Sequence, residues 1–402
     1  MYLYVVQEKR DIRVLGNKKQ YFKFLEQNEK ELKKRQGEKD DLKENNKNEN
    51  KIEKIKSLSE LKVAAILDEF TTECFKYEVE LITFTPQNWE SILSGNIPHL
   101  LFVESCWFGN NNSWGTLIES KKNNHIEELK KLLSFCTKHN IPSVFWCKED
   151  PTHYQLFSPI ATLFEYVFTS DENMIPSYKK DYGIEAYPLS FFCQPKIHNP
   201  IELLERKNKA VFAGTYYAQK PERCDDFNNL ILALEMNNIG YDIYDRCYNR
   251  QMKAFEFPEK YKSNILGYLP PEDIWKAYKG YKYQINLNSV KDSPTMFARR
   301  VYESLACGTP VISNYSIGVE KYFGDIVICS DDPKEISKKL LLIENDPASY
   351  KKTVEAGIRR VLSYHTLEER MVFVLSKIYT GTLIEKLKRY ITIFAFLKDD
   401  ED

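Results

Sequence analysis

The sequence lacks a CxxC pair, a glycine-rich GxGxxG loop and a net charge, and each absence removes a class of protein. The nine cysteines have no ligand-like spacing, so we expect reduced core thiols rather than a metal site or a disulfide framework. The formal net charge of -1 gives no support for a general nucleic-acid or membrane-surface binder. Without GxGxxG, NAD binding has no support either.

The chain also lacks a long hydrophobic run. No apolar stretch reaches the roughly 18 residues of a membrane-spanning helix, and no signal peptide is seen. We therefore expect a cytoplasmic protein. With 402 residues, 43% of them hydrophobic and 29% charged, the chain has the material for two or three domains with sizeable cores.

Residues 24–60 consist almost entirely of Lys, Glu, Asn and Asp. Such a stretch cannot bury enough apolar surface to form a core. We interpret it as a solvated helix or a disordered linker, and residues 1–60, which include one strand-like start at 2–6, as an N-terminal extension.

From Leu61 onward, short apolar runs that predict strands alternate with helical stretches. The first series lies at 62–67, 80–84, 99–104, 142–147, 165–170 and 186–190, and the second at 209–214, 241–245, 283–288, 310–313 and 325–330. Helical spacing separates them, for instance at 126–139, 222–237 and 333–344. This alternation indicates parallel sheets covered on both faces. We expect an α/β protein with two Rossmann-like domains, 61–195 and 196–365, a cleft between them, and a crossover helix and tail over 366–402.

After the run at 283–288, Ser293 is a natural N-cap and Pro294 fits a first helical position. A helix is therefore expected to begin at about Pro294. Ligands of open parallel sheets lie beyond the carboxyl ends of the strands. The bare amides of Thr295, Met296 and Phe297 would then face the cleft, ready to hold an anion.

Two arginines lie in the next turn of this expected helix. Arg299 and Arg300 work against the helix dipole, and an anionic ligand would offset that cost. Glu303 lies four residues after Arg299, where the two could pair, and Gly308 ends the helix. Taken locally, a surface ion pair and a plain C-cap explain the pattern equally well.

Several motifs resemble one family. "LLFVESCWFGNNNSWG", "VFWCKEDPTHY", "VFAGTYYAQKPERCDDF" and "NSVKDSPTMFARRVYESLACGTPVISN" are similar to the spore-maturation (CgeB-type) glycosyltransferase-like proteins of GT-B fold, over about residues 61–380. The resemblance implies a nucleotide-sugar domain at the C-terminal side and an acceptor domain before it.

"YESLACGTPVIS" also resembles the nucleotide-sugar segment of retaining family-four glycosyltransferases. Glu303 matches the second glutamate of that segment, which in such enzymes hydrogen-bonds the nucleotide ribose. The first glutamate contacts the donor sugar there, and its position is occupied here by Thr295. The family-four mechanism therefore does not transfer directly.

Basic residues follow the first strand of the second series. Gly214 and Thr215 lie on the turn, and Lys220 and Arg223 at the start of a helix. Enzymes of this fold commonly place a basic pair here to neutralise the departing diphosphate. The alternative is a turn with solvated basic residues.

Glu149, Asp150 and His153 leave one strand end together in "WCKEDPTHY". A carboxylate or histidine there could act as general base or hold the acceptor hydroxyl. The alternative is that Asp150 belongs to a loop and that His153 caps a helix.

The loop "ESCWFGNNNSWG" carries Glu104, Trp107, Asn110 and Trp114. Exposed tryptophan suits stacking on a sugar ring and asparagine suits its hydroxyls, so these residues are candidates for acceptor binding. The alternative is that the tryptophans pack the loop onto the domain.

Two weaker candidates lie at other strand ends. Asp68 and Glu69 lie at the end of the first strand of the first domain, a turn that approaches the donor or acceptor in proteins of GT-B fold, and Asp68 is a candidate for acceptor binding. Asp245 and Arg246 follow a strand of the second domain, near the base or phosphates, or serve the fold alone. Residues 364–379 are expected to form a helix that crosses back to the first domain. The amphipathic tail beyond them could contact a membrane surface or a partner, or pack on the protein.

These observations together predict a glycosyltransferase. A nucleotide sugar, UDP- or GDP-linked, would bind in the second domain, and a cell-surface glycan or similar acceptor in the first. No cofactor, metal or nucleic acid is required, because protein cations can neutralise a diphosphate. Two alternatives stay open: a silent GT-B binding module that pairs with another transferase, and a sugar-nucleotide epimerase.

Overall fold

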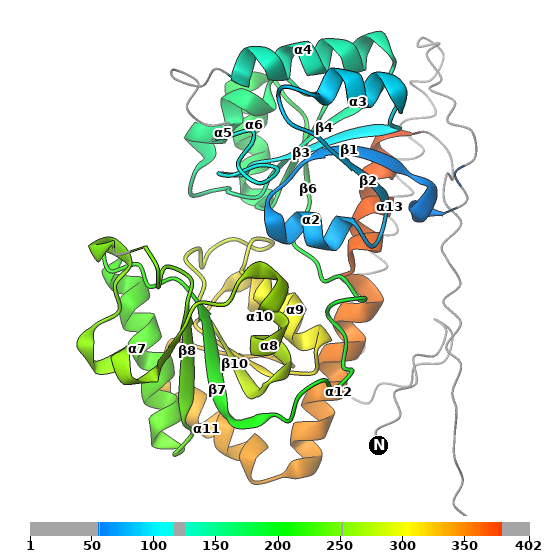
Figure 1. The fold of residues 1–402 in the computed structure, drawn as a ribbon. Helices are drawn as coiled ribbons and strands as arrows, with labels where there is room; N and C mark the ends of the chain where they lie inside the picture. The colour runs from blue at the N-terminus through cyan, green and yellow to red at the C-terminus, as the bar shows by residue number, and fades with distance from the viewer. Residues whose placement is uncertain (1–54, 56, 116–124, 251, 380–402) are drawn as a thin grey trace, which may run out of the picture. The chain divides into compact units, whose positions relative to one another are not determined.

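The computed structural model describes residues 55, 57–115, 125–250 and 252–379. The expected strand at 2–6, almost all of the charged segment at 24–60, and the tail beyond residue 379 lie outside these residues. The described chain forms two parallel six-stranded sheets, one after the other along the sequence (Figure 1).

The first sheet has the strand order β2-β1-β3-β4-β5-β6, which is the flavodoxin-like order with one strand added. Its strands are β1 Lys62–Ile66, β2 Glu80–Thr83, β3 Leu100–Glu104, β4 Ser143–Cys147, β5 Tyr166–Thr169 and β6 Ala186–Pro188. η1 Leu58–Glu60 precedes β1, and the connecting helices are α2 Glu69–Phe75, α3 Trp89–Gly95, α4 His125–Lys138, α5 Tyr154–Ala161, η2 Glu172–Met174 and α6 Ile175–Tyr182.

The second sheet has the order β12-β11-β10-β7-β8-β9, which is the Rossmann order 3-2-1-4-5-6. Its strands are β7 Lys207–Gly214, β8 Tyr241–Asp245, β9 Ile265–Gly267, β10 Tyr281–Asn286, β11 Val311–Ser313 and β12 Ile328–Cys329. Its helices are α7 Pro221–Met236, η3 Lys253–Phe255, η4 Glu259–Asn264, η5 Pro271–Asp273, α8 Trp275–Lys279, α9 Arg300–Ala306, α10 Ile317–Phe323, α11 Pro333–Glu344 and α12 Pro347–Tyr364.

The expected α/β class with two parallel sheets is therefore confirmed, and each of the eleven expected strands is present. The strand that the sequence did not reveal is β9. It has only three residues, of which Gly267 alone is buried, and its short apolar stretch was not assigned as a strand.

Two different sets of helices cover the faces of the first sheet. Side chains of α3, α4, α5 and α6 share one apolar cluster with alternate strand residues. On the opposite face, Phe75 of α2 contacts Phe102 at 5.1 Å, and Phe373 contacts Phe168 at 6.2 Å between ring centroids. Phe373 belongs to α13, Leu367–Ile378, which lies beside the first sheet in orange-red in Figure 1. The helix expected over 364–379 thus packs on the first sheet.

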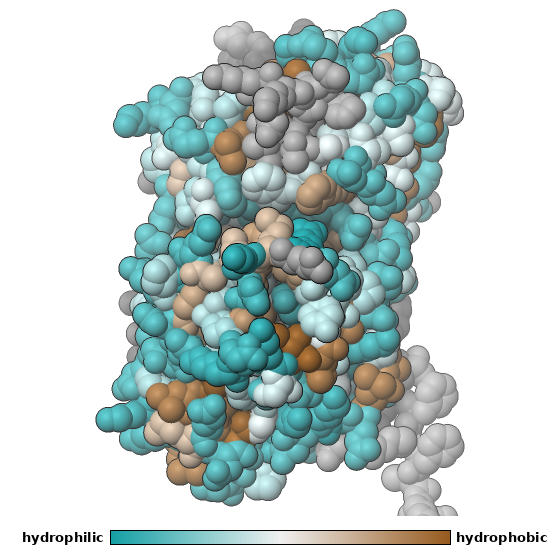
Figure 2. Space-filling view, turned by 60° about the vertical axis from the view of Figure 1, so that its left-hand side comes forward, coloured by the Kyte–Doolittle hydropathy of each residue, from teal (hydrophilic) through white to brown (hydrophobic). Residues whose placement is uncertain are grey.

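The surface seen in Figure 2 is largely hydrophilic, with hydrophobic side chains in separate small patches. All nine cysteines are free thiols, and seven of them are buried, as expected from their spacing. Within the described ranges, no helix has the length and apolar character needed to cross a membrane.

Candidate functional site

The strand orders locate where each sheet would hold a ligand. In open parallel sheets the ligand crevice opens at the carboxyl ends of the strands, where the strand order reverses. In the second sheet this switch point lies between β7 and β10, and in the first between β1 and β3. The residues at these four strand ends are therefore the first to consider.

Three arginines gather where β7 ends. Arg300, the first residue of α9, has its guanidinium so close to Gly214 that a Cβ there would lie 2.9 Å from Nη2. Arg223, in the first turn of α7, donates through Nη1 to the Thr215 carbonyl at 3.0 Å. Arg246 follows β8, and its amide donates to the Gly214 carbonyl at 3.0 Å. We call Arg223, Arg246 and Arg300 the arginine cluster.

Among the described residues, no member of the arginine cluster forms an ion pair. Arg300 Nη1 and Arg223 Nε are buried and have no hydrogen-bond partner among the described residues. Burial, with the charge of Arg300, lowers the pKa of Arg223 to about 10. Burial also lowers the pKa of Arg300. Buried charges normally have partners, so this cluster calls for an anion.

The neighbouring arginine behaves differently. Arg299 Nε donates to Glu303 Oε1 at 2.8 Å, and the Tyr278 hydroxyl donates to Glu303 Oε2 at 2.7 Å. Burial alone would raise the pKa of Glu303, but the charge of Arg299 lowers it. The expected Arg299–Glu303 pair is confirmed, and it lies buried rather than on the surface.

Glu303 and Arg299 line a pocket of about 510 Å³ together with Phe70, His198 and Trp275. Its walls combine aromatic and aliphatic side chains with a few polar groups, as in sites for organic ligands.

The expected start of the helix at Pro294 is wrong. α9 begins at Arg300, and residues 294–299 are irregular. Ser293 Oγ does accept from the Met296 amide at 2.9 Å, but it closes a turn rather than a helix. The amides of Thr295, Met296 and Phe297 are therefore not a helix N-terminus.

Two of these three residues have structural partners. The Thr295 hydroxyl donates to the Ser170 carbonyl and accepts from the Glu172 amide, both at 2.9 Å. The Phe297 ring is buried and stacks on Tyr302 at 4.9 Å. Lys220, by contrast, is exposed and lies over the Tyr217 ring at 5.3 Å, and Arg223 lies over the same ring at 4.7 Å.

A second charged group lies at the switch point of the first sheet. Lys148, just after β4, donates to Glu104 Oε1 at 2.8 Å and also bonds Asp68. The Asp68 amide donates to the same Glu104 oxygen at 2.5 Å. We call Asp68, Glu104 and Lys148 the carboxylate–lysine triad. Lys148 was not singled out from the sequence, although its place directly after a strand was the signal available.

The two carboxylates of the carboxylate–lysine triad differ in environment. Glu104 is 0% exposed and its Oε2 has no hydrogen-bond partner among the described residues. Burial, with the charge of Asp68, raises the pKa of Glu104 to about 7. The Asp68 side chain is 27% exposed. Although burial alone would raise its pKa, Lys148 and Arg299 lower it.

The three candidates for catalysis separate in the structure. His153 Nδ1 lies 3.0 Å from Glu149 Oε2, and both side chains are partly exposed. Asp150 is 0% exposed, and its oxygens accept from Cys147, Thr169 and Tyr178. The expectation that Asp150 emerges at the strand end with the other two is therefore wrong.

The expected acceptor loop is largely structural. Trp114 is 0% exposed and its indole donates to the Phe84 carbonyl at 3.0 Å, so its expected role in stacking on a sugar is wrong. The Asn110 amide bonds backbone groups of Ala65, Leu67 and Phe84. Trp107 stays half-buried, with its ring 5.1 Å from that of His153.

No group of three or more His, Cys, Asp or Glu side chains within the described part of the chain is arranged to hold a metal ion. The charged groups at the two switch points are thus a set of arginines in one sheet and a lysine-bridged pair of carboxylates in the other. The first suits an anion, and the second suits hydrogen-bond donors such as hydroxyls.

Comparison with known proteins adds a family match. Residues 229–376 match the family model described as glycosyl transferase-like, and no curated protein matches the chain. A glycosyltransferase from Rickettsia africae is 12% identical, with a TM-score of 0.49 over 79% of this chain and 97% of that one. Anabaena Alr3699/HepE, solved with UDP-glucose, is 12% identical, with a TM-score of 0.48 over 78% and 91%.

Likenesses with TM-scores below 0.5 are too distant to transfer an activity. The family match covers less than half of the chain, but it includes Arg246, Arg300 and Glu303. The part of the chain that carries two of the three clustered arginines is therefore glycosyl transferase-like in sequence.

Proposed function

We propose that this protein is a glycosyltransferase that takes a sugar from a nucleotide-sugar donor, UDP- or GDP-linked in the first instance, and moves it to a hydroxyl of a glycan acceptor. The observation that carries the proposal is the arginine cluster. At the switch point of the second sheet, Arg300 lies against Gly214, Arg223 bonds the Thr215 carbonyl and the Arg246 amide bonds the Gly214 carbonyl, and none of the three forms an ion pair with a described carboxylate. The glycosyl transferase-like match of residues 229–376 supports the same reading.

The charge of the cluster suits the reaction. Transfer breaks the bond between the anomeric carbon and a diphosphate oxygen, whose electron pair stays on that oxygen. The leaving nucleoside diphosphate gains negative charge in the transition state, where preorganised cations stabilise it most. Arginine presents paired N–H donors that match phosphate oxygens. Lys220, exposed at the start of α7, would add a further cation.

The acceptor side is proposed for the first sheet. Asp68, whose side chain is 27% exposed, would accept hydrogen bonds from acceptor hydroxyls, with Trp107 beside it in the same strand-end region. Glu104, expected from the sequence to contact the acceptor, is 0% exposed and would instead hold Asp68 and Lys148 in place. The attacking hydroxyl forms the new bond to the anomeric carbon and gives its proton to a base. The His153–Glu149 pair is the proposed base, because Glu149 can hold the Nδ1 proton and leave Nε2 to take the proton.

Calorimetry with UDP-, GDP-, dTDP- and CDP-sugars tests the proposal. We expect one donor to bind. Arg300→Met should weaken the binding of the corresponding nucleoside diphosphate by about 1.5–3 kcal/mol, because a charged contact is lost. The control is Arg360→Met on α12, where the guanidinium pairs with Asp325 at 3.0 Å. Its affinity should equal that of the wild type.

The same panel, followed by NMR, separates the alternatives. If no donor binds, the proposal is rejected. If a donor binds but is neither hydrolysed nor transferred, the protein is a silent binding module. If a donor is converted to another sugar nucleotide without any acceptor, the protein is an epimerase.

A further inference from the structure

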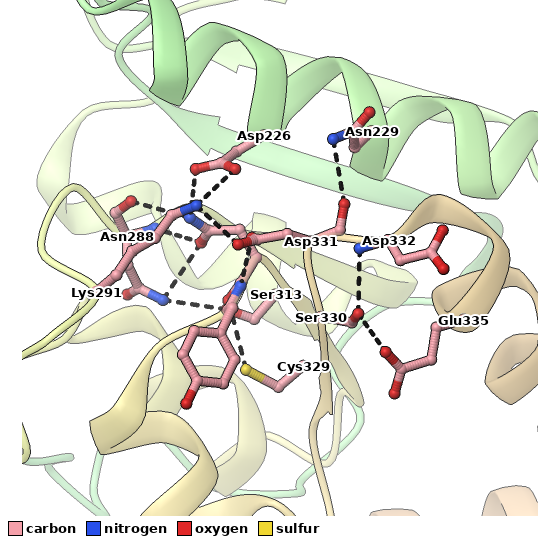
Figure 3. Close-up of polar contacts among 12 residues, drawn as sticks. Asp226, Asn229, Asn288, Lys291, Ser313, Cys329, Ser330, Asp331, Asp332 and Glu335 are labelled. Atoms are coloured by element: carbon pink, nitrogen blue, oxygen red, sulfur yellow. Dashed lines mark hydrogen bonds and ion pairs between the residues drawn. The ribbon is translucent and has the colours of Figure 1, made fainter.

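A lysine at the carboxyl end of the second sheet has two carboxylate partners from different elements. Lys291 Nζ lies 2.7 Å from Asp226 Oδ1 and 2.9 Å from Asp331 Oδ2. Asp226 belongs to α7 and Asp331 follows β12, while Lys291 lies on the segment between β10 and α9. Figure 3 shows Lys291 reaching up to Asp226 on the helix, with Asp331 beside it.

Asp226 lies on the same helix as one member of the arginine cluster. Arg223 and Asp226 are three residues apart on α7, a spacing that places two side chains on one helix face and lets opposite charges pair. Both side chains are buried. The charge of Asp226 acts on Arg223 and favours its protonated form. Glu222 and Asp225 are nearer in sequence but exposed, so Asp226 is the buried carboxylate of α7 that could neutralise Arg223.

Each oxygen of Asp226 has a hydrogen-bond partner other than Arg223. Lys291 bonds its Oδ1, and the Asn314 side chain donates to its Oδ2 at 2.9 Å. Lys291 stays charged in this place, because its hydrogen bonds to Asp226 and Asp331 raise its pKa although burial alone would lower it. Arg223 meanwhile has Nε buried without a partner among the described residues.

Backbone contacts hold Lys291 in this position. Its carbonyl accepts from the Ile317 amide at 2.8 Å. Further along the same segment, the Ala298 amide donates to Asn288 Oδ1 at 3.0 Å. The segment that ends at Arg300 is thus bonded within itself through Asn288 and fixed to α10 and α7 through Lys291.

We propose that Lys291 is a positioning residue: by pairing with Asp226 it keeps this carboxylate from pairing with Arg223, so that Arg223 remains available for the diphosphate of the donor. This inference rests on the proposed function. It assigns Lys291 no contact with the ligand. Its effect passes through Asp226 and Arg223.

The test is a double-mutant comparison by calorimetry. The probes are the nucleoside diphosphate that the wild type binds best among UDP, GDP, dTDP and CDP, and the corresponding monophosphate. Lys291→Met should lower the affinity for the diphosphate about tenfold, because Asp226 loses its lysine partner and can pair with Arg223. Lys291→Met combined with Asp226→Asn should restore affinity to within about twofold of the wild type, because the competing carboxylate is gone.

A merely structural ion pair predicts the opposite for the double variant, since removing both partners cannot rebuild a scaffold. The proposal is overturned if the double variant binds as weakly as Lys291→Met, or if Lys291→Met binds as well as the wild type. The matched control is Lys282→Met: Lys282 lies near the start of β10, at the opposite end of that strand, and pairs with Glu344 at 2.9 Å with similar burial. It should change stability alone.

Two readouts keep the outcomes separate. Melting temperatures show whether each variant folds, and Lys291→Gln replaces Lys291→Met if the latter does not, with the same expected order of affinities. A wild type that binds none of the four diphosphates rejects the proposed function, and this inference with it. A wild type that binds, with no rescue in the double variant, rejects only the role of Lys291.

Discussion

At the scale of single residues, Gly214 shows why the end of β7 has no side chain. A Cβ at this position would lie 2.8 Å from the Phe212 ring and 2.9 Å from Arg300 Nη2. Gly214→Ala must therefore displace the guanidinium or the ring. We expect weaker binding of a nucleoside diphosphate and a loss of about 1–3 kcal/mol of stability from overpacking.

Calorimetry and urea denaturation measure these two effects of Gly214→Ala. Gly95→Ala is the control, because a Cβ there would meet nothing within 4 Å. Unchanged diphosphate affinity in Gly214→Ala would mean that the position of Arg300 over this glycine is irrelevant to the ligand.

Glu104 makes a second prediction at this scale, about pH. Burial raises the pKa of Glu104 from 4.5 to about 7 in the folded protein. Between these values the folded state holds a proton that the unfolded state has released, so the stabilising effect is complete below about pH 4.5 and is lost as the pH rises to about 7. The size of this change is roughly 3 kcal/mol.

Glu104→Gln removes this titration. Urea denaturation at about pH 5 and about pH 7 should show the wild type losing stability relative to Glu104→Gln as the pH rises. Glu90→Gln, at an exposed position of α3, is the control and should leave the pH profile of the wild type unchanged. A pH-independent difference between wild type and Glu104→Gln would contradict the assignment.

At the scale of elements, the stability of α13 depends on the side chain that caps its N-terminus. The Thr366 side chain accepts from the Glu369 amide at 3.3 Å and caps the helix. Thr366→Ala should cost about 1 kcal/mol of stability, measured by urea denaturation. Thr162→Ala is the comparison, because that exposed hydroxyl donates to a carbonyl and satisfies no helix amide. A cost below that of Thr162→Ala would show that α13 needs no cap.

α9 shows how a local signal can be real and still mislead. Ser293 and Pro294 form the expected start of a helix, and Ser293 does accept from the Met296 amide. Yet the Ser293 hydroxyl also donates to Asp171 at 2.5 Å, and Phe297 enters a buried aromatic cluster. Tertiary contacts hold the segment in a turn, so the helix starts six residues later.

At the scale of the whole molecule, Thr295 connects the two sheets. Its hydroxyl bonds backbone groups of Ser170 and Glu172, which follow β5 of the first sheet. Thr295→Val keeps the volume but leaves these buried groups unpaired, so we expect a loss of about 1–3 kcal/mol of stability with diphosphate affinity unchanged. Calorimetry measures the diphosphate affinity of Thr295→Val, and urea denaturation measures its stability. Weaker donor binding at unchanged stability would instead give Thr295 the sugar contact that its position has in family-four enzymes.

The candidate site could be foreseen in part. Arg223 and Arg300 follow from their places in the early turns of helices expected after strands, and Glu303 from its four-residue spacing to Arg299 and its match to the family-four segment. The burial of Asp150 could not be foreseen, and that of Trp114 was one of two alternatives, because a polar or aromatic residue after a strand has the same sequence pattern whether its partners are solvent or the core. The partners that bury them, Tyr178 and Phe84, lie far away in the sequence.

By itself the sequence determined the class of fold: strands and helices follow from periodicities that local side-chain burial imposes. It also determined that Arg299 could pair with Glu303, since a four-residue spacing on a helix is local. The folding of the chain adds that Arg300 forms no ion pair within the described ranges, that Lys148 joins Asp68 to Glu104, and that Lys291 holds Asp226. Contacts such as Lys148 with Glu104 and Lys291 with Asp226 join residues from separate elements. Which charged side chains meet therefore depends on how the strands are ordered in each sheet.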